Sequence, residues 1–385
     1  MKKIILSMSL IIMMSGCWNY NELNNYSIAT GMAIDYKDDK YIVSFLISNG
    51  KRELSSSNKS TYHSTLYSGE GITIYEAIKN IELISTKKLY IGHLTSIVIS
   101  EEVARRGLYD SLEYLLEDFS SKKNFYVVLA KGSNAKDILS ITNPLTDFSS
   151  ESISDNIEAS NKLQGNIIAK TYNDVIYDLV NDGIDTAISS YVIVGDTKKG
   201  VTDENLNSVE PSAYIKLDDL GIFKGDKLVA WADKEKSMGI NIINNNADDV
   251  YINIDCDSGY IVVTANNLKT EKEISKDSIK INTIGSATIK EITCNINLED
   301  ENNIKKLKIK VNNKIKDIIK DGYMFARDNG SDIFGLGLTL YRNHPLYYKN
   351  IDWYDNYLKI EPEINVDINI ENNGTLKNTM RLANE

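Results

Sequence analysis

The most chemically definite residue of this 385-residue sequence is Cys17, which directly follows the small pair Ser15-Gly16. An N-terminus that runs from two lysines through an apolar segment, residues 4–14, to small residues is typical of an export signal. The apolar segment has roughly half of the ~20 residues that a membrane-spanning helix needs. A thiol at this junction is the atom that a lipid-modifying enzyme alkylates with diacylglycerol. The pattern therefore predicts a lipoprotein signal peptide, residues 1–16, that is cleaved before Cys17.

The predicted product at Cys17 is an S-diacylglycerol cysteine that also carries an N-palmitoyl group. More than one acyl chain gives lasting attachment, because each buried CH2 contributes about 0.8 kcal/mol and a single chain is marginal. Residues 17–25 are mostly polar and form the predicted lipidated tether. We therefore expect a protein that is lipid-anchored on the extracytoplasmic face of a membrane. The alternative is a plain signal peptide, or an N-terminal membrane helix that happens to contain a cysteine.

Beyond Cys17, the sequence has few residues in patterns that indicate catalysis. The three histidines, His63, His93 and His344, form no His-x-x-x-His pair, and no Cys-x-x-Cys pair occurs. The sequence also has no Gly-x-Ser-x-Gly elbow and no Gly-Lys-Ser/Thr phosphate loop. The 54 Asp and Glu residues are too many for a catalytic pair to be selected from spacing alone. We expect no enzyme activity, no metal and no cofactor.

The formal net charge of −11 limits the classes of partner. A nucleic-acid-binding protein would show a basic patch or stripe, and the sequence has none, so we expect no nucleic acid. An acidic protein is not drawn to anionic lipid headgroups by its overall charge. The lipid at Cys17 is therefore expected to provide the membrane attachment.

Cys256 and Cys294 are the two remaining cysteines, and both lie in segments that alternate like strands. A disulfide would persist in an extracytoplasmic compartment. Two cysteines in a chain of this size do not make a disulfide framework, so we favour two buried, reduced side chains. The disulfide remains the open alternative.

Three groups of residues are ambiguous between a functional and a structural role. Gly69-Glu70-Gly71 precedes a helix and could offer amides to an anion, although a tight turn is the simpler interpretation. His93 is expected to be a hydrogen-bonded structural histidine. Aromatic residues cluster near the C-terminus and suit either a partner interface or a tyrosine-rich edge of the core: Tyr341, Tyr347, Tyr348, Trp353, Tyr354 and Tyr357.

The segment 26–142 alternates between strand and helix patterns, which predicts an N-terminal α/β subdomain. A capping box at Thr73 and Glu76 predicts a helix start, and an apolar stripe predicts a second helix over residues 100–119. The segment 143–210 is predicted to be a middle subdomain and linker. Its first part, residues 143–165, is polar, with weak helical character over residues 153–163, and is expected to be an exposed linker or docking segment. Thr171 with Asp174 forms a second capping box.

The segment 211–385 is predicted to be a C-terminal α/β subdomain. Short strands precede a hairpin over residues 250–265, and a long amphipathic helix is predicted over about 301–327. A further helix is predicted over residues 332–342 and a closing strand over 361–371. The predicted fold class is mixed α/β (α+β), with several mixed β-sheets flanked by helices.

The order of short motifs resembles the Ger(x)C family, the C-subunit lipoproteins of spore nutrient germinant receptors. Five stretches carry the resemblance: Cys17-Trp18-Asn19-Tyr20-Asn21-Glu22, residues 69–77, residues 89–101, residues 223–228, and residues 331–345. Two residues depart from the family pattern, since Asn19 replaces the usual Asp and Tyr348 replaces the usual Trp of a Pro-x-Tyr-Trp-Lys segment.

The resemblance implies a three-subdomain fold, an anchor at the spore inner membrane, and assembly with the membrane-spanning A and B subunits of the germinant receptor. It implies a non-enzymatic subunit required for nutrient-triggered germination, and we expect that it acts as a scaffold. The alternative is an extracytoplasmic solute-binding lipoprotein that captures the germinant. The expected partner contacts are Trp18, Glu22, Gly69, Glu70, Gly71, His93, Tyr347, Tyr348 and Trp353.

Overall fold

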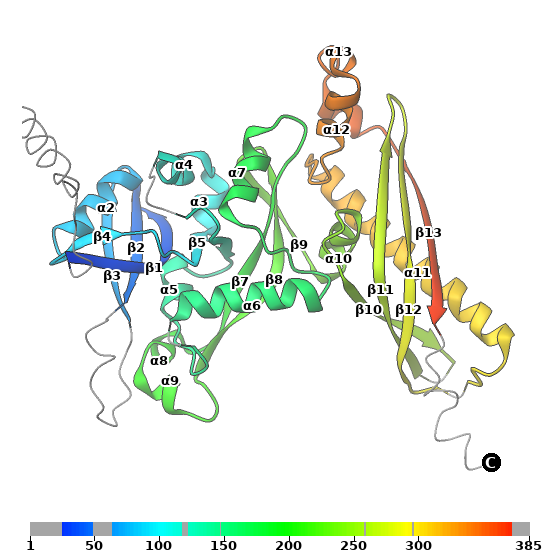
Figure 1. Ribbon diagram of the computed structural model, residues 1–385, viewed down its shortest axis with the longest axis horizontal. Helices are drawn as coiled ribbons and strands as arrows, with labels where there is room; N and C mark the ends of the chain where they lie inside the picture. The colour runs from blue at the N-terminus through cyan, green and yellow to red at the C-terminus, as the bar shows by residue number, and fades with distance from the viewer. Residues whose placement is uncertain are drawn as a thin grey trace, which may run out of the picture.

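The fold consists of two β-sheets side by side along the longest axis of the molecule, each covered by helices (Figure 1). The computed structural model describes residues 25–48, 64–117, 122–146, 148–257, 259–294 and 296–371. The signal peptide, Cys17, Trp18 and Glu22 lie outside the described residues. Both sheets mix parallel and antiparallel pairs, which confirms the predicted mixed fold class.

The larger sheet has nine strands in the order β3-β2-β1-β5-β6-β7-β8-β9, with β4 beside β1. Its centre is parallel (β1, β5, β6, β7) and its two sides are antiparallel. The strands are β1 (Tyr26–Lys37), β2 (Lys40–Ser48), β3 (Ser64–Gly71), β4 (Lys88–Tyr90), β5 (Ser96–Ser100), β6 (Tyr126–Ala130), β7 (Ala187–Gly195), β8 (Ala213–Lys224) and β9 (Lys227–Ala232).

Helices cover both faces of this sheet, so its central strands are apolar on both sides. In β5, Ile97 and Ile99 face one core and Val98 faces the other. The first core is closed by α2 (Ile74–Glu82), α3 (Glu101–Arg106), α4 (Tyr109–Glu117) and α7 (Tyr172–Val180). The second is closed by α5 (Ala135–Ser140) and α6 (Ser149–Leu163). Two short helices, α8 (Thr197–Gly200) and α9 (Asp203–Asn207), lie between β7 and β8.

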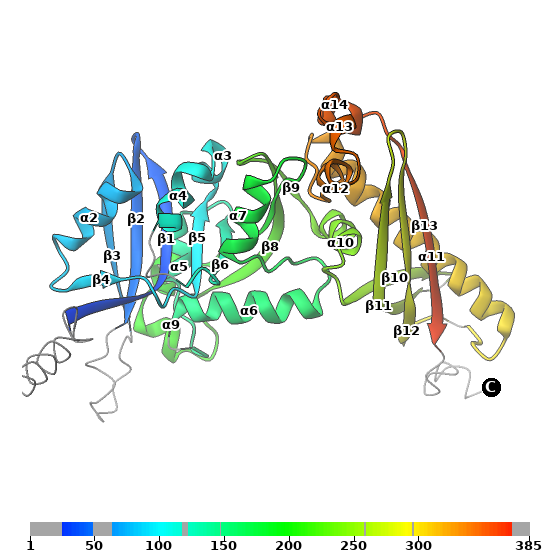
Figure 2. The same cartoon turned by 45° about the horizontal axis from the view of Figure 1, so that its top comes forward.

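The smaller sheet has the order β10-β11-β12-β13. Its strands are β10 (Asp249–Cys256), β11 (Gly259–Ile274), β12 (Ile279–Ile292) and β13 (Pro362–Glu371). One face packs on α10 (Lys234–Ile243) and α11 (Glu301–Asp328), as Figure 2 shows. A Cβ atom on Gly239 would lie 2.1 Å from the carbonyl oxygen of Ile318, so a glycine lets α10 approach α11 closely. The chain between α11 and β13 forms α12 (Leu336–Asn343), α13 (Pro345–Tyr348) and α14 (Trp353–Tyr357).

Several predicted elements match the structure in place and in cause. The capping box of Thr171 and Asp174 starts α7 with both of its hydrogen bonds. The predicted long helix is α11, and Asp300 caps it by accepting from the Asn302 amide. The hairpin of β10 and β11 is present. At α2 only half of the predicted box forms, because Glu76 accepts from the amide of Ile72 rather than from that of Thr73.

Two predicted helical patterns were wrong in extent. The stripe over residues 100–119 is broken at Gly107, whose φ of +138° no other residue adopts easily, so α3 and α4 are separate helices. The predicted helix over 332–342 begins only at Leu336, because Asp332 lies in the turn before it and accepts from the Leu336 amide.

Two further expectations are corrected by packing. The segment expected to be an exposed linker forms the fifteen-residue helix α6, whose Ile153 and Ile157 are fully buried against the larger sheet. Cys256 and Cys294 are joined in a disulfide, with Cα atoms 6.3 Å apart, rather than reduced. The disulfide ties the end of β10 to the chain just after β12. The predicted division into three subdomains stays a prediction, and the larger sheet continues across residue 211.

Candidate functional site

The predicted partner contacts that the structure describes fall into two separate groups. Gly69, Glu70 and Gly71 end β3, and His93 lies in the connection between β4 and β5. Tyr347, Tyr348 and Trp353 belong to α13 and α14, beside the smaller sheet. These residues therefore do not form one continuous site.

Gly69 and Gly71 belong to a strand rather than to the turn that the sequence suggested. A Cβ atom on Gly69 would lie 2.3 Å from the Ala77 carbonyl oxygen, and one on Gly71 would lie 2.5 Å from the Ala77 amide nitrogen. The absence of side chains therefore lets β3 lie directly against α2. Glu70, between them, is exposed.

His93 is exposed, and its ring meets that of Tyr90 edge to face at 5.8 Å between centroids. Tyr90 makes a similar contact with Tyr26, at 5.6 Å. The three rings form a small aromatic group at the start of β1. His93 therefore lies close to the point at which the chain enters the larger sheet.

Trp353 is buried, whereas Tyr347 and Tyr348 are partly exposed. The indole nitrogen of Trp353 donates to Oδ2 of Asp332 at 3.0 Å. Burial raises the pKa of Tyr348 to about 12. Trp353 is thus part of the core edge, and the interpretation of a tyrosine-rich core edge holds for this part of the cluster.

Asp332 is the most completely enclosed acid in the described chain. Its Oδ1 accepts from the Leu336 amide at 3.1 Å, and its Oδ2 accepts from the Gly337 amide at 2.7 Å as well as from Trp353. Burial raises the pKa of Asp332 to about 6, against the effect of these donors. The carboxylate fixes the start of α12 and the side chain of Trp353 at once.

Asp185 extends this network into the larger sheet. It lies just before β7, and its amide donates to the Asp332 carbonyl oxygen at 2.9 Å while its Oδ2 accepts from the Asp332 amide at 2.7 Å. Oδ1 accepts from the Gly225 amide at 2.7 Å, and Oδ2 also accepts from the Tyr354 hydroxyl at 3.0 Å. Burial raises the pKa of the Asp185 carboxyl above its usual value. We call Asp185, Asp332, Trp353 and Tyr354 the junction cluster.

The junction cluster joins segments that are far apart in the chain. Asp185 and Asp332 are 147 residues apart in the chain. The neighbouring Ser331 donates a hydrogen bond from its hydroxyl to the Phe223 carbonyl oxygen at 2.5 Å. Asp332 appears in a motif of the sequence, but Asp185 has no local pattern that marks it. The cluster positions the two sheets, and its donors and acceptors are used within the protein.

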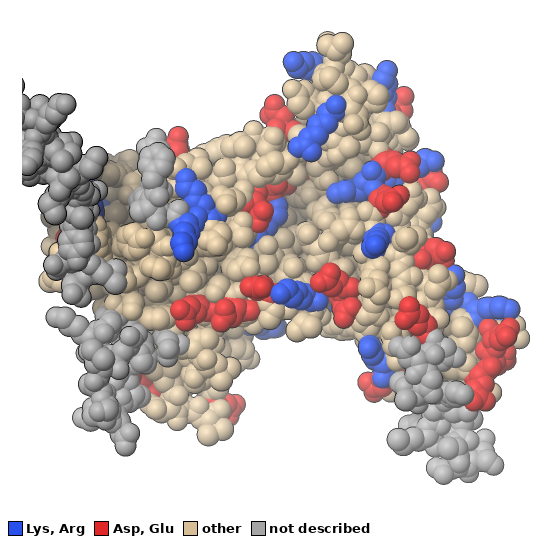
Figure 3. Space-filling model, in the orientation of Figure 1, with Lys and Arg blue, Asp and Glu red and all other residues tan. Residues whose placement is uncertain are grey.

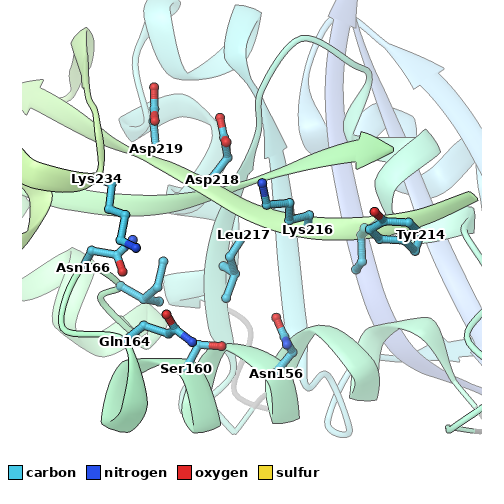
Figure 4. Close-up of a pocket in the computed structure, with 12 residues that line it drawn as sticks. Asn156, Ser160, Gln164, Asn166, Tyr214, Lys216, Leu217, Asp218, Asp219 and Lys234 are labelled. Carbon is cyan, nitrogen blue, oxygen red and sulfur yellow. The ribbon is translucent and has the colours of Figure 1, made fainter. Parts of the chain in front are cut away.

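A polar cavity of about 430 Å³ lies between α6 and β8 (Figure 4). Asn156 and Ser160 from α6, and Gln164 just after it, line one side of the cavity, and Leu217 projects from β8 toward α6. Lys216 and Lys234 also line it. This mixture of amides, a hydroxyl and ammonium groups is able to hydrogen-bond a small polar solute.

The acids at the edge of this cavity already have a cation. Asp218 and Asp219 point away from α6 in Figure 4, and both accept from Nζ of Lys131, at 2.8 and 2.6 Å. Burial is the largest single effect on Asp218 and opposes its charge, but the hydrogen bond and the positive charge of Lys131, together with the Asp219 amide and Lys216, hold the pKa of this carboxyl below its usual value.

Neither a metal site nor a membrane span occurs in the part of the chain that the structure describes. No group of three or more His, Cys, Asp or Glu side chains there could hold a metal ion. No helix there is both long and apolar enough to cross a bilayer. On the face shown in Figure 3, basic and acidic side chains are interspersed and do not form a single-sign patch.

Two family models cover most of the chain. The model described as spore germination protein N-terminal domain matches residues 19–194, and the model described as spore germination B3/GerAC like, C-terminal, matches residues 218–374. The chain belongs to the Ger(x)C family of spore germination proteins. The gap between the two matches, residues 195–217, runs from the end of β7 into β8. These strands are neighbours in the larger sheet, so this Ger(x)C sheet contains strands from both family domains.

Relatives of this Ger(x)C chain come from Bacillus subtilis (strain 168). Spore germination protein KC is 24% identical over 384 residues, which cover 95% of this chain and 93% of the relative. Spore germination protein B3 is 27% identical over 139 residues, which cover 35% of this chain and 36% of that protein. The crystal structure of the GerBC protein has the same fold, with a TM-score of 0.54 and 16% identity over 92% of this chain and 100% of that one.

The junction cluster bridges the two domains of this Ger(x)C protein. Asp185 falls in the N-terminal family match, and Asp332, Trp353 and Tyr354 fall in the C-terminal match. Membership in this family supports a role in spore germination.

Proposed function

We propose that this chain is a lipid-anchored, non-enzymatic subunit of a spore nutrient germinant receptor, required for nutrient-triggered germination. The observation that carries the proposal is the match to spore germination protein KC over nearly the whole of both chains. Two sequence features support it further, namely the export signal that ends at Cys17 and the lack of catalytic motifs.

The proposed mechanism is scaffolding of the membrane-spanning A and B subunits. A diacylglyceryl and palmitoyl anchor on Cys17 keeps the protein on the membrane that holds its partners. Confinement to one surface raises the effective concentration of each interface, so that modest contacts suffice to hold a complex. We propose that Trp18, Glu22, Glu70, His93, Tyr347 and the exposed part of Tyr348 contribute such contacts. Gly69, Gly71 and Trp353 act indirectly, through the packing of the segments that carry them.

The decisive variant is Cys17→Ala, expressed at the native level in the spore-forming host. Without the thiol no diacylglycerol can be attached, so we expect loss of the protein from the spore membrane fraction and a germination rate at least about tenfold lower in nutrients. Asn19→Ala is the matched control, because it leaves the thiol in place. Membrane retention of Cys17→Ala together with normal germination would contradict the proposal.

The second candidate, capture of a solute, is favoured by the polar cavity between α6 and β8. Its test is calorimetric titration of the purified chain with nutrient amino acids and sugars, repeated with Gln164→Ala and with Lys216→Ala. Heat of binding that both variants abolish would support it. Equal heat in the wild type and in both variants, or none in any of them, would leave scaffolding as the function.

A further inference from the structure

The connection between α2 and β4 lies beside the first described residues of the chain. Strand β4 pairs with the start of β1, with Lys88 opposite Tyr26 and Leu89 opposite Ser27. The hydroxyls of Ser27 and Ser85 are 3.2 Å apart. The α2–β4 loop, by which we mean residues 83–87 together with Lys88, the first residue of β4, is therefore fixed next to the segment that leads back to Cys17.

This loop exposes a pair of aliphatic side chains. Leu83 has 83% and Ile84 has 55% of its surface accessible to solvent. They follow directly on α2, whose own apolar residues Ile74, Ile78 and Ile81 are buried against the sheet. Leu83 and Ile84 are thus not among the buried residues of the core that the helix closes.

Basic and aromatic groups surround the aliphatic pair. Among the residues that the structure describes, neither Lys87 nor Lys88 forms an ion pair, whereas Glu82 is paired with Lys79 at 2.7 Å. Tyr26 and Tyr90 stack edge to face at the base of the loop. A shallow polar hollow of about 490 Å³ is lined by Asn25, Glu82, Ser85, Thr86, Lys87 and Lys88.

The length of the chain between the anchor and the sheet limits where this end can be. Seven residues separate Cys17 from Asn25, so their Cα atoms are eight steps apart and a fully extended chain between them spans at most about 29 Å. Figures 1 and 2 both place α2, β4 and the start of β1 at one end of the longest axis. A lipidated Cys17 therefore holds this end close to the bilayer.

We propose that the α2–β4 loop inserts Leu83 and Ile84 into the interfacial region of an anionic phospholipid bilayer, with Lys87 and Lys88 at the lipid phosphates. This inference rests on the proposed lipidation of Cys17 for its placement in the cell. The insertion of each aliphatic side chain is favourable because it removes apolar surface from water. Each lysine near an anionic surface adds roughly a fivefold gain in binding. Tyrosine rings suit the headgroup level, where one end is apolar and the other is wet.

The acidic character of the whole chain is compatible with this contact. The formal net charge is −11, so the body as a whole is repelled by an anionic surface. Screening limits that repulsion to about 8 Å at physiological salt, whereas the lysines of the loop are in contact with the lipid. The loop therefore sets an orientation in which the α2 end faces the bilayer and the β10–β13 sheet lies away from it.

The first test uses the full mature chain with its lipid, reconstituted into vesicles of phosphatidylglycerol and phosphatidylethanolamine. An environment-sensitive fluorophore is attached through Leu83→Cys in one sample, and through Leu346→Cys in the control. Leu346 is equally exposed but lies at α13. We expect a blue-shifted emission at position 83 that brominated lipids quench, and neither effect at position 346. Equal, water-like emission at both positions in an anchored protein would overturn the proposal.

The second test removes the dependence on lipidation. The Cys17→Ser chain without its signal peptide is floated with the same vesicles and with phosphatidylcholine vesicles. We expect binding to the anionic vesicles that falls at least tenfold in Leu83→Asp/Ile84→Asp and roughly fivefold in Lys88→Ala, with Leu346→Asp unchanged. Equal flotation of all variants would count against the loop even where the anchor is confirmed. In the fluorescence test, a change in emission at position 83 that requires the receptor subunits and does not occur with lipid alone would assign the loop to a protein partner instead.

Discussion

Asp332 is held as an acceptor by the protein itself. Both of its oxygens face N–H donors, from Leu336, Gly337 and Trp353, and no Lys or Arg in the described chain forms an ion pair with it. A buried acid without a cation is costly, since burial disfavours its charge, yet loss of the acceptor would leave three enclosed donors unpaired. Asp332 is therefore a structural residue whose chemistry is confined to the interior.

We expect Asp332→Asn to destabilise the protein by about 2–3 kcal/mol. The new amide would point its own N–H group at one of the three donors, so at least one buried hydrogen bond is lost. Urea denaturation followed by circular dichroism measures the change in midpoint. Asp321→Asn, at an exposed position of α11, is the control and should change stability by less than about 0.5 kcal/mol. A midpoint equal to that of the wild type would refute this role of the carboxylate.

The raised pKa of Asp332 gives stability a definite dependence on pH. Its pKa is about 6 in the folded protein and about 3.9 in an unfolded chain, so the folded state binds a proton more tightly. The stability from this group is fully present below about pH 4 and is lost as the pH rises through 6, by up to about 3 kcal/mol. The wild type should therefore exceed Asp332→Asn by more at pH 4.5 than at pH 7.5 in urea titrations. A constant difference between the two proteins would show that Asp332 does not titrate in this range.

Between elements, glycines set how closely a helix approaches a strand or another helix. Gly69 places β3 against α2 and Gly239 places α10 against α11, in both cases through contacts with the helix backbone. The Gly69-Glu70-Gly71 motif, which the sequence indicates to be a turn, is thus a packing surface in the structure. This packing also holds the α2–β4 loop in position, because α2 leads directly into it.

Gly69→Ala should destabilise the larger sheet by about 1–3 kcal/mol, the range typical of overpacking. The added methyl would lie 2.3 Å from the Ala77 carbonyl oxygen, and backbone cannot move aside as a flexible side chain can. Hydrogen exchange should show faster exchange in α2 and β3 but not in α11. Glu70→Ala, at an exposed position of the same strand, should leave exchange unchanged. Unaltered protection of α2 in Gly69→Ala would show that the helix adjusts without strain.

The elements that the sequence predicted well are those with a strong periodic pattern. Helix α11 combines an apolar stripe, from Leu307 to Ile319, with an Asp300 cap. Helix α6 was not predicted to be a buried helix, because only Ile153 and Ile157 bury a large apolar side chain within a run of Ser and Asn. The break between α3 and α4 at Gly107 was not predicted, because the apolar stripe continues through it.

The junction cluster could not have been predicted from spacing. Asp185 is one of 54 acidic residues, and its partner is 147 positions away. No local periodicity records a contact of that range. Asp332 belongs to a motif of the sequence, but that motif does not indicate that its side chain is buried. For the same reason the sequence wrongly favours reduced cysteines, because only the register of β10, β11 and β12 brings Cys256 near Cys294.

Across the whole molecule, the two sheets are joined by a continuous apolar core. Ala187 and Ile222 of the larger sheet belong to the same buried cluster as Ile240 and Phe334. Asn241 adds hydrogen bonds from α10 to the carbonyl oxygens at positions 165 and 167. Domains move freely relative to one another unless their interface is large and apolar, and this one combines an extended apolar cluster with the buried hydrogen bonds of Asn241 and of the junction cluster. The protein is therefore built to hold its two ends at a fixed separation.

A rigid body of this kind should give one narrow distance between its two sheets. Nitroxide labels at Lys40→Cys on β2 and Lys290→Cys on β12, both exposed positions, allow double electron–electron resonance to measure it. We expect a single narrow peak in the wild type. In Asp332→Ala the peak should widen yet stay single, because the variant loses three hydrogen bonds and keeps the apolar core. Asp321→Ala should match the wild type. Two separate peaks in the wild type would mean that the two sheets move as independent bodies. The protein could not then use rigidity to position its partners relative to a fixed anchor.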